Sequence, residues 1–208
     1  MTSPNTSATG GYLDPFGSSP LFDDAFEDFL HDVVVGLTGL DPKAVRPRLQ
    51  VAEGVAPRIP EPEISWVALG VQTSDPLGQR AQTTHEPADD GVDVQVTFDR
   101  TTVLISFYGL TPWAIAGQLC DGLRARQNRE ELTFAGVALQ RIGTRRNVGA
   151  IGPNNRPMRR VDLELAFDRA ILRRYRVLNL LRATGSVQYP AGATPRDATT
   201  PFDTEASP

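Results

Sequence analysis

The side chains best able to do chemistry lie in the first helix that the sequence predicts. Glu27, Asp28, His31 and Asp32 place carboxylates and an imidazole on adjacent helical turns, a set that can hold a metal ion or relay protons. Acidic residues near a helix start and on its wet face are, however, ordinary helix stabilisers. We therefore expect neither a metal site nor a catalytic site here.

A second acidic cluster follows further along the chain. It consists of His85, Glu86, Asp89, Asp90 and Asp93, with Gly91 inside it. The cluster lacks the alternating carboxylate spacing of a calcium-binding loop. A solvated loop is the simpler interpretation.

A glycine- and asparagine-rich loop is expected from Gly143 to Pro157. Because it contains Arg145 and Arg146, we considered a phosphate cradle, but the Gly-Lys-Ser/Thr ending and the glycine spacing of such loops are missing. The loop is better interpreted as a flexible connection or a subunit contact. It supplies four candidate interface residues: Arg145, Arg146, Asn154 and Asn155.

Nucleophilic, redox and zinc chemistry have little support. Cys120 is the single cysteine, and His31 and His85 are the two histidines, so neither an internal disulfide nor a zinc ligand set is expected. No Gly-x-Ser-x-Gly motif is present. No apolar run is long enough for a membrane span or a secretory signal, so we expect synthesis in a cytosol. The sequence predicts a protein that is not an enzyme and has no cofactor.

Charge is distributed unevenly along the chain. Residues 1–120 hold 6 basic and 16 acidic groups, whereas residues 121–189 hold 14 basic and 6 acidic groups, and 20 of the 21 basic residues are arginine. A ring of identical subunits needs two complementary surfaces on each subunit, which opposite charges would favour. A nucleic-acid-binding module is the rival class, but such modules are basic overall, and this chain has a pI of about 5.2.

The chain divides into one domain and two arms. Residues 1–20 and 190–208 are rich in small polar residues and proline, so we expect flexible arms on either side of a single domain at residues 21–189. Tyr12, Leu13 and Phe16 are apolar groups within the first arm. They are candidates for anchoring the arm on a neighbouring subunit, against the alternative of a plain disordered terminus.

Hydrophobic periodicity predicts an α+β domain, with an antiparallel or mixed sheet and helices on one face. The first helix should begin at Ser19 or Pro20 and end at Gly36 and Gly39. In the second strand the apolar residues change from even to odd positions near Asp99, which indicates a bulge or a tight hairpin. The prolines between Asp41 and Glu63 should prevent any ladder or helix there. Further helices are expected from Thr111 and over 129–135, and strands over 64–72, 92–108, 137–142, 161–167 and 186–189.

Several strings, in order from about residue 5 to about residue 182, resemble the bacteriophage neck terminator family. They are Asn5–Leu13, Gly36–Arg48, Trp66–Val71, Ser106–Gly109, Gln127–Glu130 and Tyr175–Leu181. Leu49 and Leu110 depart from the family pattern, and these changes affect packing and a turn. The matching strings are structural and carry no catalytic chemistry.

The resemblance implies a role in virion assembly. It implies a tail-terminator-like fold and a hexameric ring that caps the head-proximal end of the tail tube, stops polymerisation and joins the tail to the head connector around a DNA passage. The implied partners are copies of the chain itself, the tail-tube protein, the head connector or stopper protein, the sheath where a tail has one, and genomic DNA that passes without sequence-specific binding. The alternatives are a head-side completion or stopper protein and, in a different class, a DNA-binding packaging module.

Overall fold

The structure is a computed structural model that describes residues 5–17, 21–48, 59–78, 80–88, 90–180, 182–187 and 200–205. It divides into two compact units. The larger unit comprises 18–82 and 96–173, and the smaller comprises 1–17, 83–95 and 174–208.

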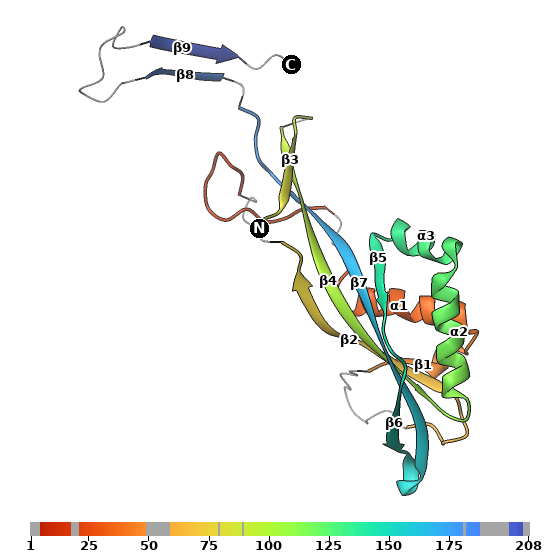
Figure 1. The fold of residues 1–208 in the computed structure, drawn as a ribbon. Coiled ribbons are helices and arrows are strands. Elements are labelled where there is room, and N and C mark those ends of the chain that lie inside the picture. The colour runs from red at the N-terminus through yellow and green to blue at the C-terminus, as the bar shows by residue number, and fades with distance from the viewer. Residues whose placement is uncertain are drawn as a thin grey trace, which may run out of the picture. The chain divides into compact units, whose positions relative to one another are not determined.

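A mixed β-sheet forms the backbone of the larger unit (Figure 1). Its strand order is β1 (Val45–Pro47), β2 (Trp66–Pro76), β4 (Val92–Tyr108), β7 (Pro157–Tyr175) and β5 (Val137–Ile142), and β6 (Arg146–Ile151) also pairs with β7. β1 runs parallel to β2, whereas β2–β4, β5–β7 and β6–β7 are antiparallel.

Three helices cover one face of this sheet: α1 (Asp23–Thr38), α2 (Pro112–Arg124) and α3 (Arg126–Phe134) (Figure 1). Their apolar positions recur at spacings of three and four, so each helix buries one stripe. The stripes pack on alternate residues of the strands. This arrangement confirms the α+β class. The largest buried side chains include Phe26, Leu30, Leu69, Ile105, Phe107, Leu119, Leu123, Leu132, Leu163 and Phe167.

Helix α1 differs at both ends from the expectation. It begins at Asp23, and the predicted cap at Ser19 and Pro20 lies outside the described residues. Gly36 is inside the helix, and Gly39 alone ends it, with φ of 68° and its N–H bonded to the Val35 carbonyl. A left-handed conformation at this position favours glycine.

Two segments predicted to lack regular structure contain strands. The proline-rich connector holds a 3₁₀ turn at Pro42–Ala44 followed by β1, a three-residue parallel strand that ends at Pro47 and so includes a proline. The loop predicted from Gly143 is the β6–β7 hairpin, closed by a 3₁₀ turn at Pro153–Asn155. Its glycines hide the alternation, and pairing with the long β7 supplies the ladder.

The bulge predicted near Asp99 lies on the neighbouring strand. β4 continues unbroken through Asp99 and Arg100, while the register shifts between Val71 and Thr73 of β2, opposite Val103 and Thr102. Because β2 has one extra residue at this point, the side chains on the two sides of the bulge are out of step with simple alternation.

In the smaller unit, residues of the amino-terminal segment pair with the carboxyl-terminal part of the chain. The Ser7 N–H donates to the Arg176 carbonyl at 3.2 Å, and Phe16 forms a bridge with Arg174. β3 (Gln82–Glu86) pairs with β4. β8 (Arg182–Val187) and β9 (Thr200–Glu205) form a two-stranded sheet, so β9 replaces part of the tail expected to lack regular structure. The domain boundaries at 20 and 189 remain a prediction.

Candidate functional site

The sheet face away from the helices carries a row of stacked side chains. Trp66 and Tyr108 are direct cross-strand partners, with ring centroids 4.1 Å apart and an interplanar angle of 6°. Arg46 of β1 lies 6.0 Å from the Trp66 ring, and Arg160 of β7 lies 5.7 Å from the Tyr108 ring. The neighbouring pair, Val67 and Phe107, points into the core, so the row occupies the opposite face. A cation–aromatic row spans four strands.

A hydrogen-bonded chain of polar groups runs beside this row. Arg48 Nη2 donates to Ser106 Oγ at 3.0 Å, and that hydroxyl donates to Asp162 Oδ1 at 2.7 Å. Arg160 donates from Nε and Nη2 to the two oxygens of Asp162, each at 2.7 Å. This bidentate pair raises the pKa of Arg160, and it holds the guanidinium plane beside Tyr108.

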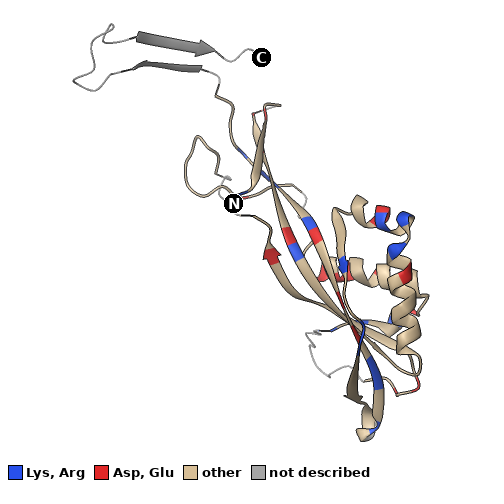
Figure 2. Cartoon of the chain, viewed as in Figure 1, with Lys and Arg blue, Asp and Glu red and all other residues tan. Residues whose placement is uncertain are grey.

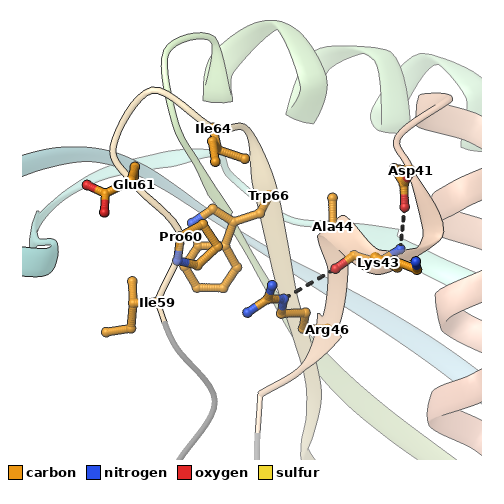
Figure 3. A pocket seen from close by; sticks show the side chains of 9 residues that line it. All are labelled: Asp41, Lys43, Ala44, Arg46, Ile59, Pro60, Glu61, Ile64 and Trp66. Carbon is orange, nitrogen blue, oxygen red and sulfur yellow. Dashed lines mark hydrogen bonds between the residues drawn. The ribbon is translucent and has the colours of Figure 1, made fainter.

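An open groove of about 550 Å³ adjoins Trp66 (Figure 3). Asp41 accepts the Lys43 N–H at 2.8 Å, and Arg46 Nε donates to the Lys43 carbonyl at 3.3 Å, which fixes one wall. Ile59 and Ile64 are about half exposed on the other wall, and Trp66 Nε1 is buried without a hydrogen-bond partner. The lining combines apolar and charged side chains, which is suited to binding an amphipathic segment.

A second groove lies on the helical face. Phe29, Val33 and Leu37 of α1 face Leu132 and Glu131 of α3 across a volume of about 240 Å³. Asn128 donates to the Gly122 carbonyl at 2.8 Å and so ties the start of α3 to the end of α2. The groove is continuous with a hollow over α2, because Gly36, Leu37 and Asn128 line both.

Arg145 and Arg146, predicted as interface residues, stand at the start of the β6–β7 hairpin. The Arg145 guanidinium lies 5.4 Å from the ring of the half-exposed Trp113 of α2. Arg146 is exposed and is directly opposite Asp162 in the β6–β7 register. Arg145 therefore places a positive charge beside α2, and Arg146 places one on the hairpin.

Asn154 and Asn155 lie in the turn that closes the hairpin, where Asn155 is exposed with φ of 57°. The side chain of Asn154 lies outside the described part of the chain. The segment 137–160 holds six arginines and neither Asp nor Glu, and Figure 2 shows basic residues near the start of β7. The hairpin end is thus strongly basic.

The three candidate anchors of the amino-terminal segment have different environments. Tyr12 is 93% exposed, whereas Leu13 and Phe16 are half-buried. Phe16 bridges to Arg174, and the Arg176 guanidinium lies 5.1 Å from its ring. Phe16 is therefore held by its own chain, and Tyr12 is the anchor best placed to reach another molecule.

The two acidic clusters form hydrogen bonds that stabilise local structure. His31 Nδ1 lies 3.0 Å from Asp32 Oδ1 and Nε2 lies 3.0 Å from the Pro42 carbonyl, which ties α1 to the 3₁₀ turn. The backbone carbonyl of Pro42, followed by Asp32, raises the pKa of His31. Within the described residues, no group of three or more metal-ligating side chains comes together.

Cys120 and His85 are also held in structural settings. Cys120 is buried on α2, and burial raises the pKa of its thiol, which disfavours the thiolate needed for nucleophilic attack. His85 lies 2.7 Å from both Asp93 Oδ1 and Asn179 Oδ1, and the bond with Asp93, followed by that with Asn179, raises its pKa.

Two features of these surfaces were missed by sequence reasoning. The Trp66–Tyr108 stack depends on a register that strand periodicity does not supply. Arg169 is 6% exposed on β7, donates to the Leu21 carbonyl at 2.9 Å and lies 4.4 Å from the Phe26 ring. The alternation that ends at Phe167 could have marked it, because Arg169 is the next residue on the same core face.

The described surfaces offer grooves, charge and exposed apolar side chains for contact with other molecules. Among the described helices, none is long and apolar enough to cross a membrane. The model of the phage neck terminator protein family matches residues 24–191, and the chain belongs to this family. It is thus a structural component of the virion neck, where tail and head components meet. No curated protein matches the chain.

Proposed function

We propose that the chain forms a homohexameric ring on the last ring of the tail tube, stops further tube growth and joins the tail to the head connector around a DNA passage. The observation that carries this proposal is the family match over residues 24–191. One surface of the ring would resemble a tube subunit, while the opposite surface would recruit the connector instead of another tube ring. The mechanism is geometric and needs no catalysis.

The distribution of charge supports a ring built from complementary surfaces. α1 holds five acidic residues and no basic one, whereas the segment 137–160 is wholly basic among its charged residues. Oppositely charged surfaces on one chain favour head-to-tail contacts, which form a ring where the rotation between subunits closes. The DNA would pass without base-specific contacts, and the partners would be the tail-tube protein, the connector or stopper protein and, in a contractile tail, the sheath.

The test is electron microscopy of lysates from a phage with an early stop codon in this gene. Overlong tubes detached from filled heads are the expected result, and complementation with the wild-type gene should restore tails of normal length. Normal-length tails separated from heads would instead indicate a head-side stopper. Intact particles would overturn the assembly role. Salt-sensitive binding of the purified chain to random duplex DNA would support the packaging class.

A further inference from the structure

The β6–β7 hairpin carries an exposed patch on the face that continues the core face of the sheet. In the hairpin register, Asn147 is opposite the buried Val161, so the residues two and four positions further along, Gly149 with Arg159 and Ile151 with Pro157, share that face. Ile151 is 72% exposed, and Pro157 and Arg159 are exposed as well. We call Leu110, Ile151, Pro157 and Arg159 the hairpin patch.

The hairpin patch is rigidly supported. Arg159 Nη1 donates to the Leu110 carbonyl at 3.2 Å, which joins the hairpin to the loop before α2, and Leu110 is itself 58% exposed. Arg156 pairs with Glu63 at 2.7 Å and holds the far end of the hairpin. An apolar knob with a basic border therefore stands at one end of the larger unit.

The groove lined by α1 and α3 is a second surface of the same unit. Figure 1 shows these two helices on the sheet face, away from the β6 end of the sheet. The floor of the groove is apolar, through Phe29, Val33 and Leu132, and its rim is acidic, through Asp32 and Glu131. Gly36 lies in α1 with no atom within 4 Å of an added Cβ, so the groove is open above it. The groove can receive an apolar side chain flanked by arginine.

We propose that the hairpin patch of one copy of this chain docks into the α1–α3 groove of the next copy, with Ile151 as the apolar anchor. The proposal rests on the ring proposed above and names the surfaces that build it. Charge complementarity favours a second copy as the occupant, because the basic hairpin would meet the acidic rim formed by Asp32 and Glu131. Since the two surfaces differ, the contact is heterologous and repeats around a closed ring.

The test uses two full-length variants, each of which blocks one surface. Ile151→Asp removes the anchor and adds a charge that the acidic rim repels, while Gly36→Arg fills the groove with a good helix former and repels the hairpin. Ile151→Val and Gly36→Ala are the matched controls. Circular dichroism and the melting temperature verify that each variant is folded.

Native mass spectrometry then gives the assembly state. Each blocking variant alone should be monomeric at concentrations tenfold above those at which the wild type and both controls form rings. An equimolar mixture should form dimers, because the intact groove of Ile151→Asp can receive the intact hairpin of Gly36→Arg, and each dimer has no second intact contact. Folded variants that stay monomeric when mixed would overturn the pairing of these two surfaces.

The same measurement separates the two proposals. If each blocking variant still forms rings as the wild type does, the proposed contact is wrong and the proposed ring stands. A wild-type chain that remains monomeric even with purified tail tubes would overturn the ring and the contact together.

Discussion

Trp66 of β2 and Tyr108 of β4 stack across the sheet, with ring centroids 4.1 Å apart and planes 6° from parallel. Cross-strand aromatic pairs stabilise a sheet beyond the area they bury. We expect a double-mutant cycle with Trp66→Ala and Tyr108→Ala to give a coupling energy of about 1 kcal/mol in urea unfolding. The same cycle between Trp66 and the 82% exposed Phe134 should be additive. Additivity in the first cycle would contradict a stabilising stack.

His31 should make the stability of the fold depend on pH. Both ring nitrogens face acceptors, the Asp32 carboxylate and the Pro42 carbonyl, so both must donate, and Asp28 adds a further negative charge nearby. These contacts raise the pKa of His31 in the folded state. Its contribution is therefore complete below the unfolded-state pKa of about 6.5 and is lost as pH rises through the higher folded-state value.

The comparison of wild type with His31→Gln measures this contribution. Glutamine can still donate a hydrogen bond but carries no charge. The loss in free energy of unfolding on substitution should be larger at pH 5.5 than at pH 8.5. A loss that is equal at the two pH values would mean that the imidazolium makes no contribution.

Gly91 allows residues 177–179 to approach the turn before β4. Its φ is 95°, and an added Cβ would lie 2.6 Å from the Val177 carbonyl oxygen and 2.8 Å from the Asn179 nitrogen. Gly91→Ala should therefore displace that segment and abolish the protection of the Asn179 amide, which donates to the Asp90 carbonyl at 3.0 Å. Hydrogen exchange measures this change.

Gly78→Ala is the control for Gly91, because Gly78 has a φ of 87° but open space around its Cβ position. It should show only the backbone strain of a left-handed alanine, roughly 1–2 kcal/mol. Equal exchange in the 174–180 segment of both variants would show that the close approach has no importance.

Arg169 is a buried cation held by a carbonyl and aromatic rings. Its Nη1 bonds to the Leu21 carbonyl, its Nε has no hydrogen-bond partner, and burial lowers its pKa. Lysine would keep a buried charge without the planar stacking on Phe26, whereas methionine would fill the space without a charge. We expect the free energy of unfolding, measured with urea, to be about 2 kcal/mol larger for Arg169→Met than for Arg169→Lys. The reverse order would show that the charge itself stabilises the site.

Tyr12 tests the proposed role of the amino-terminal segment. Because its side chain is 93% exposed, Tyr12→Asp should leave the melting temperature of the monomer unchanged. If the segment lies on a neighbour, the substitution should shift ring formation to at least tenfold higher protein concentration, whereas Asp14→Ser in the same segment should not. Sedimentation velocity measures the assembly state. If Tyr12→Asp forms rings at the same protein concentration as the wild type, Tyr12 does not contribute to the interface.

Local pattern by itself determined much of the fold. The spacing of Phe26, Leu30 and Leu37 predicted α1, and the alternation of Val161, Leu163 and Leu165 predicted the centre of β7, because period 3.6 and period 2 each place apolar side chains on one face. The α+β class and the helices on one face followed from these periods. Arg145, Arg146 and Asn155 are exposed, as their polar side chains favour, and their place at an interface stays a prediction.

Tertiary structure decided what lies beside what. The β6–β7 hairpin was predicted as a loop because its glycines interrupt alternation. It forms because β7 begins at Pro157, before the predicted strand start at Val161, and so provides a partner for β6. The stack of Trp66 on Tyr108, the contacts of Arg169 with Leu21 and Phe26, and the groove between α1 and α3 each join residues that are distant in sequence. Local periodicity carries no information on strand register or helix packing, which depend on side chains that meet only when the chain is folded.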